Sequence, residues 1–328
     1  MDKKNIFIMA ATVIACLVIA FFCLSAKKDS LKDLPTVAIA NLGPLKDLEI
    51  SIQGIKDELA DNGFIDGKTV KIRYVDVAFD QSLIPQAIES LRNHNPKVMV
   101  AVTTPVAQFA KKKIRDIPLV FHSITDPRAA GLLKNNDQPD GNVTGASDAQ
   151  NVNGLLEFIK SVLPEAKTVG MLYLTSDSND VTMMEMVSAA APSFGLTVFA
   201  IPVEQPRDIS MRMQKFSGKV DLIYVGLSNA ILAALPTISS EAKKMYIPVF
   251  AAEDTAVRDS LAVVSFGVNS ESIGRNAGKL VVKLLKGKQV KDLAPIFPKI
   301  ENHECFINKK LAEKFGLKIP KNAIVVGE

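Results

Sequence analysis

VMVAVTTPVAQFAK, residues 98–111, combines a strand with the start of a helix. Residues 98–102 form an unbroken apolar run of strand length, which is typical of a strand buried on both faces of a parallel sheet. Thr104 suits the N-cap of the helix that follows, and Pro105 suits its first position because proline has no N–H to leave unpaired there. The lysine triplet at 111–113 favours the C-terminus of this helix.

The turn between this strand and helix predicts an anion site. Ligands of open parallel sheets bind at the carboxyl ends of the strands. The free N–H groups of a helix N-terminus carry partial positive charge. We therefore expect Thr103 and Thr104, with this helix N-terminus, to bind an anionic group of a ligand, in the first instance a carboxylate. The alternative is an ordinary turn, since every α/β protein has several that bind nothing.

Strand and helix patterns alternate along the chain and then restart, which predicts an α/β fold of two doubly wound lobes of parallel sheet. The expected strands are 36–40, 69–75, 98–102, 117–121, 168–173, 196–200, 221–225, 247–251, 261–268 and 306–308, with a short strand or turn at 141–145. The expected helices are 48–62, 83–93, 105–113, 153–163, 181–194, 208–216, 231–244, 271–285 and 309–315.

Residues 1–28 are expected to be an export signal or an N-terminal membrane anchor, followed by a polar linker at 29–33. Two lysines precede an apolar run at 6–26 that is long enough to span a bilayer. Three outcomes remain open: cleavage after Ser25-Ala26, lipidation at Cys16, or retention of the segment. A lipid site at Cys23 is less suitable because bulky phenylalanines precede it. Each outcome places the body outside the cytoplasmic membrane.

Composition excludes several classes of protein. The chain of 328 residues has a formal net charge of +4 with both signs interspersed, whereas a nucleic-acid surface needs a clustered basic patch. A transcriptional regulator would need a DNA-binding motif at the N-terminus, where this chain has the apolar segment instead. Cys305 is the single cysteine of the body, and the three histidines are scattered, so we expect no metal site and no cofactor. No phosphate-binding glycine loop, nucleophile elbow or nucleophile–base pair appears, so we expect no enzyme.

Polar residues gather in the loops that follow the expected strands, where ligands of this fold class bind. They are hydroxyl, amide and carboxylate side chains, which suit hydrogen bonding to a small polar ligand better than covalent chemistry. Turns and helix caps use the same residue types, so any one of them could be purely structural. The candidates are Thr103, Thr104, Ser123, Thr125, Asp126, Ser147, Asp148, Ser176, Ser178, Asn179, Ser228, Asn229, Glu253 and Asp254.

Short motifs in a fixed order give the chain a family resemblance. PLVF at 118–121, TDP at 125–127, GNVTG at 141–145 and IPVF at 247–250 are among them. The chain resembles the substrate-binding proteins of ABC transporters that have a periplasmic-binding-protein type I fold, in the group that includes binders of tryptophan and other aromatic amino acids. The resemblance covers nearly everything after the export segment.

The resemblance implies a two-lobed clamp that closes by a hinge around a ligand in the cleft. The chain would cross between lobes near 147–152, 269 and 300, giving lobe 1 as 34–149 plus 270–300 and lobe 2 as 150–269 plus 301–328. The implied function is to bind a small polar ligand, an amino acid or related carboxylate, for an ABC importer. The partners would be the ABC permease with its ATPase and, through the N-terminal segment, the membrane, at the periplasmic or extracellular face. The alternative is a membrane-tethered ligand sensor with the same clamp.

Departures from the family pattern concern the ligand. The chain has Asp76-Val77 where relatives have Asn-Ala, Tyr173-Leu174-Thr175 where they have Tyr-Asn-Pro, and Ser228-Asn229 where an Asp-Asn pair is common. Without a carboxylate at Ser228, an α-ammonium group would need Glu253, Asp254 or Asp148. The chain has no tryptophan, so a ring that stacks on the ligand would be Phe79 or Phe121, and Phe121 could instead belong to the core.

Overall fold

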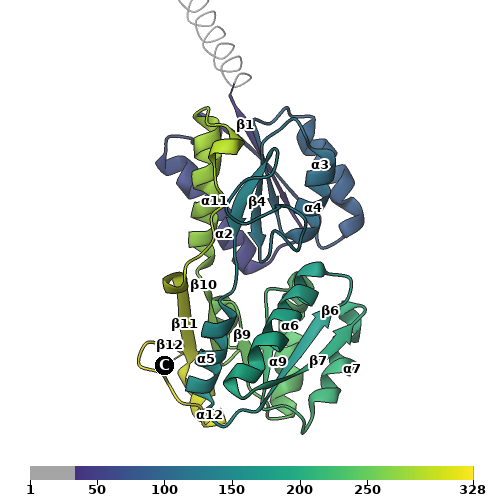
Figure 1. Ribbon diagram of the computed structural model, residues 1–328, viewed down its shortest axis with the longest axis vertical. Coiled ribbons are helices and arrows are strands. Elements are labelled where there is room, and N and C mark those ends of the chain that lie inside the picture. Colours follow the sequence, from purple (N-terminus) through teal and green to yellow (C-terminus); the bar gives the residue numbers. More distant parts are fainter. Residues whose placement is uncertain (1–33, 328) are drawn as a thin grey trace, which may run out of the picture.

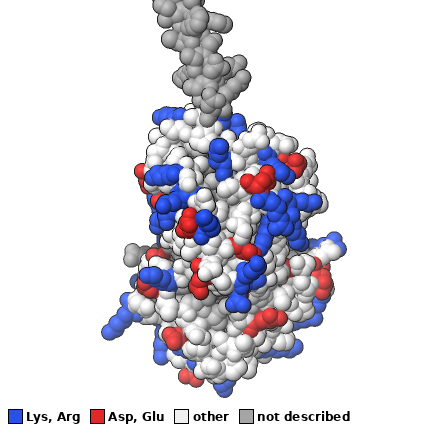
Figure 2. Space-filling model, turned by 45° about the horizontal axis from the view of Figure 1, so that its top comes forward, with Lys and Arg blue, Asp and Glu red and all other residues white. Residues whose placement is uncertain are grey.

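Two separate β-sheets, each flanked by helices, organise the chain in the computed structural model, which describes residues 34–327 (Figure 1). The predicted export segment, Cys16 and the linker lie outside these residues. Between residues 34 and 327, no helix has both the length and the apolar character needed to cross a bilayer. On the face shown in Figure 2, basic and acidic side chains are both present among neutral ones.

The first sheet has five parallel strands in the order β2-β1-β3-β4-β5. Every residue of the central strand β3 is buried, as its apolar run predicts. The strands are β1 (Thr36–Asn41), β2 (Lys71–Asp76), β3 (Val98–Val102), β4 (Leu119–Ile124) and β5 (Val143–Ser147).

Four helices cover the two faces of this sheet. The helices α2 (Lys46–Asp61) and α11 (Ser270–Leu285) pack on one face, where Ile55 and Val281 are fully buried. The helices α3 (Ile84–Arg92) and α4 (Thr104–Lys113) pack on the other, around Ile88 and Phe121. Phe121 is thus a core residue, as the alternative interpretation proposed.

The second sheet has seven strands in the order β12-β11-β10-β9-β8-β6-β7. They are β6 (Thr168–Leu174), β7 (Thr197–Val203), β8 (Leu222–Val225), β9 (Val249–Ala251), β10 (Val264–Val268), β11 (His303–Asn308) and β12 (Ile324–Val326). One face carries α5 (Val152–Val162), α6 (Ser178–Ala190) and α12 (Lys309–Phe315). The other carries α7 (Ile209–Met213), α8 (Asn229–Ala233), α9 (Leu235–Lys244) and α10 (Asp254–Arg258). Two α/β sheets, dominated by parallel strands, confirm the predicted fold class.

One strand pair departs from the parallel pattern, because β11 runs antiparallel to β10. The chain leaves the second sheet at the end of β10 to form α11 beside the first sheet. The segment after α11 runs beside β5, where Ser147 N–H donates to Ile296 O over 2.9 Å. The chain then returns to the second sheet. Because it re-enters at the end from which β10 left, β11 must run in the opposite direction.

Three local predictions require correction. The helix α4 begins at Thr104, so Thr103 occupies the cap position, with φ 76° and no capping bond from its side chain. The expected helix 231–244 is divided into α8 and α9, because Pro236 cannot donate the N–H bond that a continuous helix needs. The strand β4 extends through Ser123 to Ile124, with a register shift that leaves Ser123 at φ 54°. The short strand β12 was not expected from the sequence.

Candidate functional site

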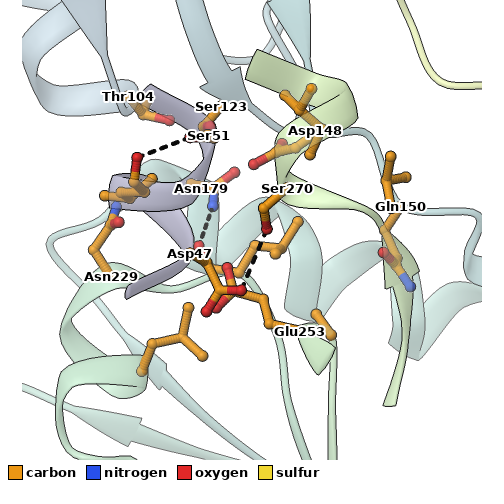
Figure 3. Close-up of a pocket in the computed structure, with 16 residues that line it drawn as sticks. Asp47, Ser51, Thr104, Ser123, Asp148, Gln150, Asn179, Asn229, Glu253 and Ser270 are labelled. Carbon is orange, nitrogen blue, oxygen red and sulfur yellow. Dashed lines mark hydrogen bonds between the residues drawn. The ribbon is translucent and has the colours of Figure 1, made fainter. Parts of the chain in front are cut away.

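A polar cavity lies where the two sheets face each other, and both contribute to its walls (Figure 3). Its polar lining residues are Asp47, Ser51, Thr104, Ser123, Asp148, Gln150, Asn179, Asn229, Glu253 and Ser270. Its apolar lining residues are Leu48, Leu227, Leu232, Ala252, Val268 and Ile273. No Lys or Arg lines it within residues 34–327, so the polar groups of this cavity are neutral or acidic.

Helix N-termini position most of these polar side chains. Asp47 and Ser51 lie in the first two turns of α2, and Thr104 is the first residue of α4. On the side of the second sheet, Asn179 is the second residue of α6 and Asn229 is the first residue of α8. Because each of these helices follows a strand of a parallel sheet, its N-terminus lies at the carboxyl ends of the strands. The geometry is therefore the one that the carboxyl-end rule predicts.

Six of the sequence candidates line the cavity: Thr104, Ser123, Asp148, Asn179, Asn229 and Glu253. In Figure 3, Thr104 and Ser123 lie toward one end, and Asp47 and Glu253 lie toward the other. Ser123 reaches this position from within a strand, because the irregularity after His122 redirects its side chain. Whether these six residues bind a ligand stays a prediction.

Eight other candidates do not line the cavity, and the structure gives most of them a local role. Thr125 Oγ1 donates to Asp148 Oδ1 over 3.0 Å, and Ser147 Oγ donates to Ile124 O over 2.7 Å. Asp126 accepts backbone N–H bonds in its own turn, and Asp254 pairs with Arg258. Ser228 Oγ accepts from Ile231 N as the cap of α8 and donates to Asp180 over 2.6 Å.

The remaining three differ in exposure. Ser176 and Ser178 are exposed at the start of α6. Thr103 is 1 % exposed, and its hydroxyl has no partner among the described residues. A β-branched residue at φ 76° and ψ 158° is strained, because this region of backbone conformation is otherwise occupied almost only by glycine.

Three carboxyl groups determine the charge of the cavity. Asp47 from α2 accepts hydrogen bonds from Thr255 Oγ1 and, over 3.3 Å, from Ser270 Oγ. Burial, and then the neighbouring Asp47 carboxylate, hold the pKa of Glu253 well above its usual range. Burial also raises the pKa of Asp148 to about 6, against the lowering effect of its bond from Thr125. A cationic group placed among these carboxyls would offset the cost of burying their charges and the repulsion between them.

The structure brings together a serine and a histidine that the sequence did not pair. His122 Nε2 lies 2.8 Å from Ser51 Oγ and 3.3 Å from Ser123 Oγ. Burial lowers the pKa of His122 to about 3, so the imidazole is neutral and a weak base near pH 7. Its Nδ1 has no partner within residues 34–327, so no third group orients the ring as in a catalytic triad. His122 therefore holds the hydroxyls of Ser51 and Ser123 at the cavity wall. The arrangement does not resemble an activated nucleophile.

Sequence reasoning missed Asp47, Ser51, Gln150 and Ser270. The helix expected at 48–62 contained Ser51 without marking it as a candidate and left Asp47 just before its start. The helix begins at Lys46, directly after the loop at the carboxyl end of β1, so the carboxyl-end rule could have identified Asp47. Within residues 34–327, no group of three or more His, Cys, Asp or Glu side chains is placed to hold a metal ion.

Comparison with known proteins places this geometry in context. The family described as ABC transporter substrate binding protein matches residues 37–327. A tyrosine-binding protein of Clostridioides difficile is 29 % identical over 283 residues, covering 86 % of this chain and 81 % of that protein.

Two solved structures are also similar. The ABC domain from Streptococcus pneumoniae in complex with L-Trp has a TM-score of 0.84 and 30 % identity, covering 89 % of this chain and 99 % of that one. A ligand-free, open substrate-binding protein with adhesive properties from Clostridium difficile has a TM-score of 0.70 and 28 % identity, with the same two coverages. With the family match extending over nearly all described residues, the chain belongs to the family of ABC transporter substrate-binding proteins.

Proposed function

We propose that this protein binds an amino acid, or a closely related carboxylate, in the cavity between the sheets and delivers it to an ABC permease and its ATPase. The observation that carries this proposal is the division of one cavity into two chemically different ends. One end has the hydroxyls of Thr104 and Ser123 at a helix N-terminus, and the other has the carboxyls of Asp47 and Glu253. An amino acid carries the two complementary groups at a fixed separation.

The ligand carboxylate would lie at the start of α4. Thr104 is 4 % exposed there, and Ser123 adds a second hydroxyl. The first N–H groups of a helix have no partner within the helix, so they can donate to an anion. The ligand ammonium would lie between Asp47 and Glu253, where its charge would offset the cost of burying carboxylates.

We further propose that the two units close on the ligand as lobes, with boundaries at 34–149 plus 270–300 and 150–269 plus 301–328. The chain passes between the sheets after β5, between β10 and α11, and before β11, which supports flexible connections there. The higher TM-score with the L-Trp complex than with the ligand-free, open structure, at similar identity, supports a closed arrangement in this structure. Asp47 in α2 belongs to the unit of the first sheet, and Glu253 at the start of α10 belongs to the unit of the second sheet. These two neighbouring carboxyls therefore come from opposite sides of the cavity.

The test is to purify the chain, release any bound ligand by denaturation, and identify it by mass spectrometry. Calorimetry with each of the common amino acids then measures affinity. We expect at least one α-amino acid to bind with micromolar or tighter affinity, while its amide and its deaminated acid bind far less tightly. Equal binding of these analogues, or no amino acid binding at all, would contradict the proposal.

Extracytoplasmic placement is proposed for the body, as in the family. Protease treatment of spheroplasts distinguishes the possibilities, because a body outside the membrane is digested while a cytosolic marker is protected. The intact mass of the purified chain shows whether residues 1–28 are cleaved, lipidated or retained.

A further inference from the structure

A groove rich in basic side chains lies at the amino ends of the strands of the first sheet, opposite the ends that face the polar cavity. Lys71, Arg73, His94 and Lys97 line it, together with Leu34 and Pro35. No Asp or Glu lines this groove within residues 34–327. We call it the basic groove.

Strand pairing brings the basic residues of this groove together although they are far apart in sequence. On one side of β1, Lys71 N–H donates to Pro35 O over 2.9 Å, and on the other side Lys97 N–H donates to Thr36 O over 2.8 Å. Arg73 lies two residues after Lys71 and therefore on the same face of β2. The backbone of the sheet thus fixes three cationic side chains around the start of β1.

Helix dipoles account for other basic residues at this end of the unit but not for those of the groove. The helices α3, α4 and α11 end here, and their last turns carry Arg92, Lys111–Lys113 and Lys283, which suit helix C-termini. The groove residues lie in or beside strands, where no helix dipole favours a positive charge. Arg73 and Lys97 are exposed and form no ion pair with a described residue. Their charges are therefore available to an anionic partner outside the chain.

The position of the groove indicates which partner this is. The described chain begins in the groove wall, at the end of the first unit that points away from the second (Figure 1). In Figure 2, Lys and Arg side chains lie close to the point where the described chain begins. Residues 27–33 separate this point from the apolar run 6–26, and seven residues span at most about 25 Å. A membrane that retained this apolar run would therefore be the large anionic surface nearest to the groove.

We propose that the basic groove binds the anionic headgroups of membrane phospholipids and holds the first unit against the membrane surface. The groove shares no residue with the polar cavity, so this inference goes beyond the proposed function. The second unit would then lie away from the membrane and remain free to move. Each Lys or Arg beside an anionic surface shifts the equilibrium toward contact by about fivefold. A tether that keeps the groove near the surface makes such weak attraction sufficient.

The experiment places the full chain on phospholipid vesicles and measures by mass spectrometry how fast a water-soluble reagent acetylates each lysine. One set of vesicles contains phosphatidylcholine alone, and the other also contains phosphatidylglycerol. We expect Lys97, and Lys68 in the exposed turn before β2, to react at least about fivefold more slowly on the anionic vesicles. Raised salt should remove this difference. Lys215, which precedes β8 in the second unit, should react equally on both.

A variant that combines Lys71→Gln, Arg73→Gln and Lys97→Gln removes the three groove charges. In this variant Lys68 should react at rates within about twofold of each other on the two kinds of vesicle, because the attraction to the anionic headgroups is lost. Thermal unfolding checks that the variant is folded.

The matched control combines Lys215→Gln, Lys219→Gln and Lys310→Gln. It removes the same charge from exposed positions of the second unit and should leave the protection of Lys68 unchanged.

Three outcomes would overturn the inference. Equal acetylation of Lys97 in the unmodified chain on neutral and anionic vesicles would show that the groove does not contact the membrane. Equal loss of protection in the two triple variants would indicate a general effect of net charge. Protection of Lys97 by inorganic phosphate alone, as complete as on anionic vesicles, would make the groove a site for a soluble anion. None of these outcomes bears on amino acid binding in the polar cavity, which calorimetry tests separately.

Discussion

Thr104 is the residue on which the carboxylate end of the site most depends. It begins α4 and lines the polar cavity, whereas Thr103 is buried and does not line it. We expect Thr104→Ala to weaken ligand binding by about 1.5–3 kcal/mol, the contribution of one hydrogen bond to a charged acceptor. Thr103→Ala serves as the comparison and should have the smaller effect on affinity. Calorimetry with the identified ligand measures both, and equal affinities for all three proteins would place the carboxylate elsewhere.

Asp180 should give the protein a pH-dependent stability. Burial, and then the Asp177 carboxylate, raise the pKa of Asp180 to about 7. Between about pH 4, its unfolded value, and pH 7 the folded chain therefore binds more protons than the unfolded chain, so the contribution of Asp180 to stability falls as pH rises through this window. Asp180→Asn keeps an oxygen that can accept from Ser228 and from Leu174 N–H.

Urea unfolding at two pH values tests this expectation. At pH 8 Asp180→Asn should have a larger unfolding free energy than the unmodified chain, by on the order of 1–4 kcal/mol. Below pH 4 the difference should disappear, because both side chains are then neutral. Glu185→Gln, on the exposed face of the same helix, should show neither effect. A difference that is constant with pH would indicate that packing, rather than ionisation, is responsible.

At the scale of secondary-structure elements, the close approach of α2 and α11 positions the two walls of the cavity that these helices form. A Cβ at Gly274 would overlap the Ser51 carbonyl oxygen, and one at Gly54 would lie 2.6 Å from Glu271 O. Gly274→Ala should therefore separate the helices and lower the unfolding free energy by about 1–3 kcal/mol. Because Ser51 and Ser270 line the cavity from these helices, ligand affinity should fall as well. Lys279→Ala, at an exposed position of α11, is the control for both measurements.

Elements were predicted well from the sequence where their pattern is local, and less well where it depends on tertiary contacts. The apolar run 98–102 and the lysines at 111–113 correctly predicted β3 and the end of α4. The left-handed conformations of Thr103 and Ser123 leave no signal in residue type, because neither residue favours them. The pairing of Asp47 with Glu253 depends on how two units separated in sequence approach each other, which no local pattern encodes.

At the scale of the whole molecule, an exposed ion pair joins the two units. Lys46 Nζ at the start of α2 lies 2.8 Å from Asp259 Oδ1, which follows α10. Exposed pairs contribute little to folding, but this pair forms only when the units approach each other. We expect Lys46→Glu to weaken ligand binding about two- to fivefold at low salt and less at high salt. Adding Asp259→Lys should restore affinity, and failure of this rescue would show that the pair plays no part in closure.

The position of α11 has a consequence for how the chain folds as it is synthesised. This helix supplies Ala277, Leu280, Val281 and Leu284 to the core that covers one face of the first sheet, yet it follows almost the whole of the second sheet in sequence. A chain that emerges from its N-terminus can cover this face with α2 early, but the part that α11 covers stays exposed until residue 285 has emerged. We therefore expect the first unit to complete its folding only late in synthesis, with apolar surface exposed until then.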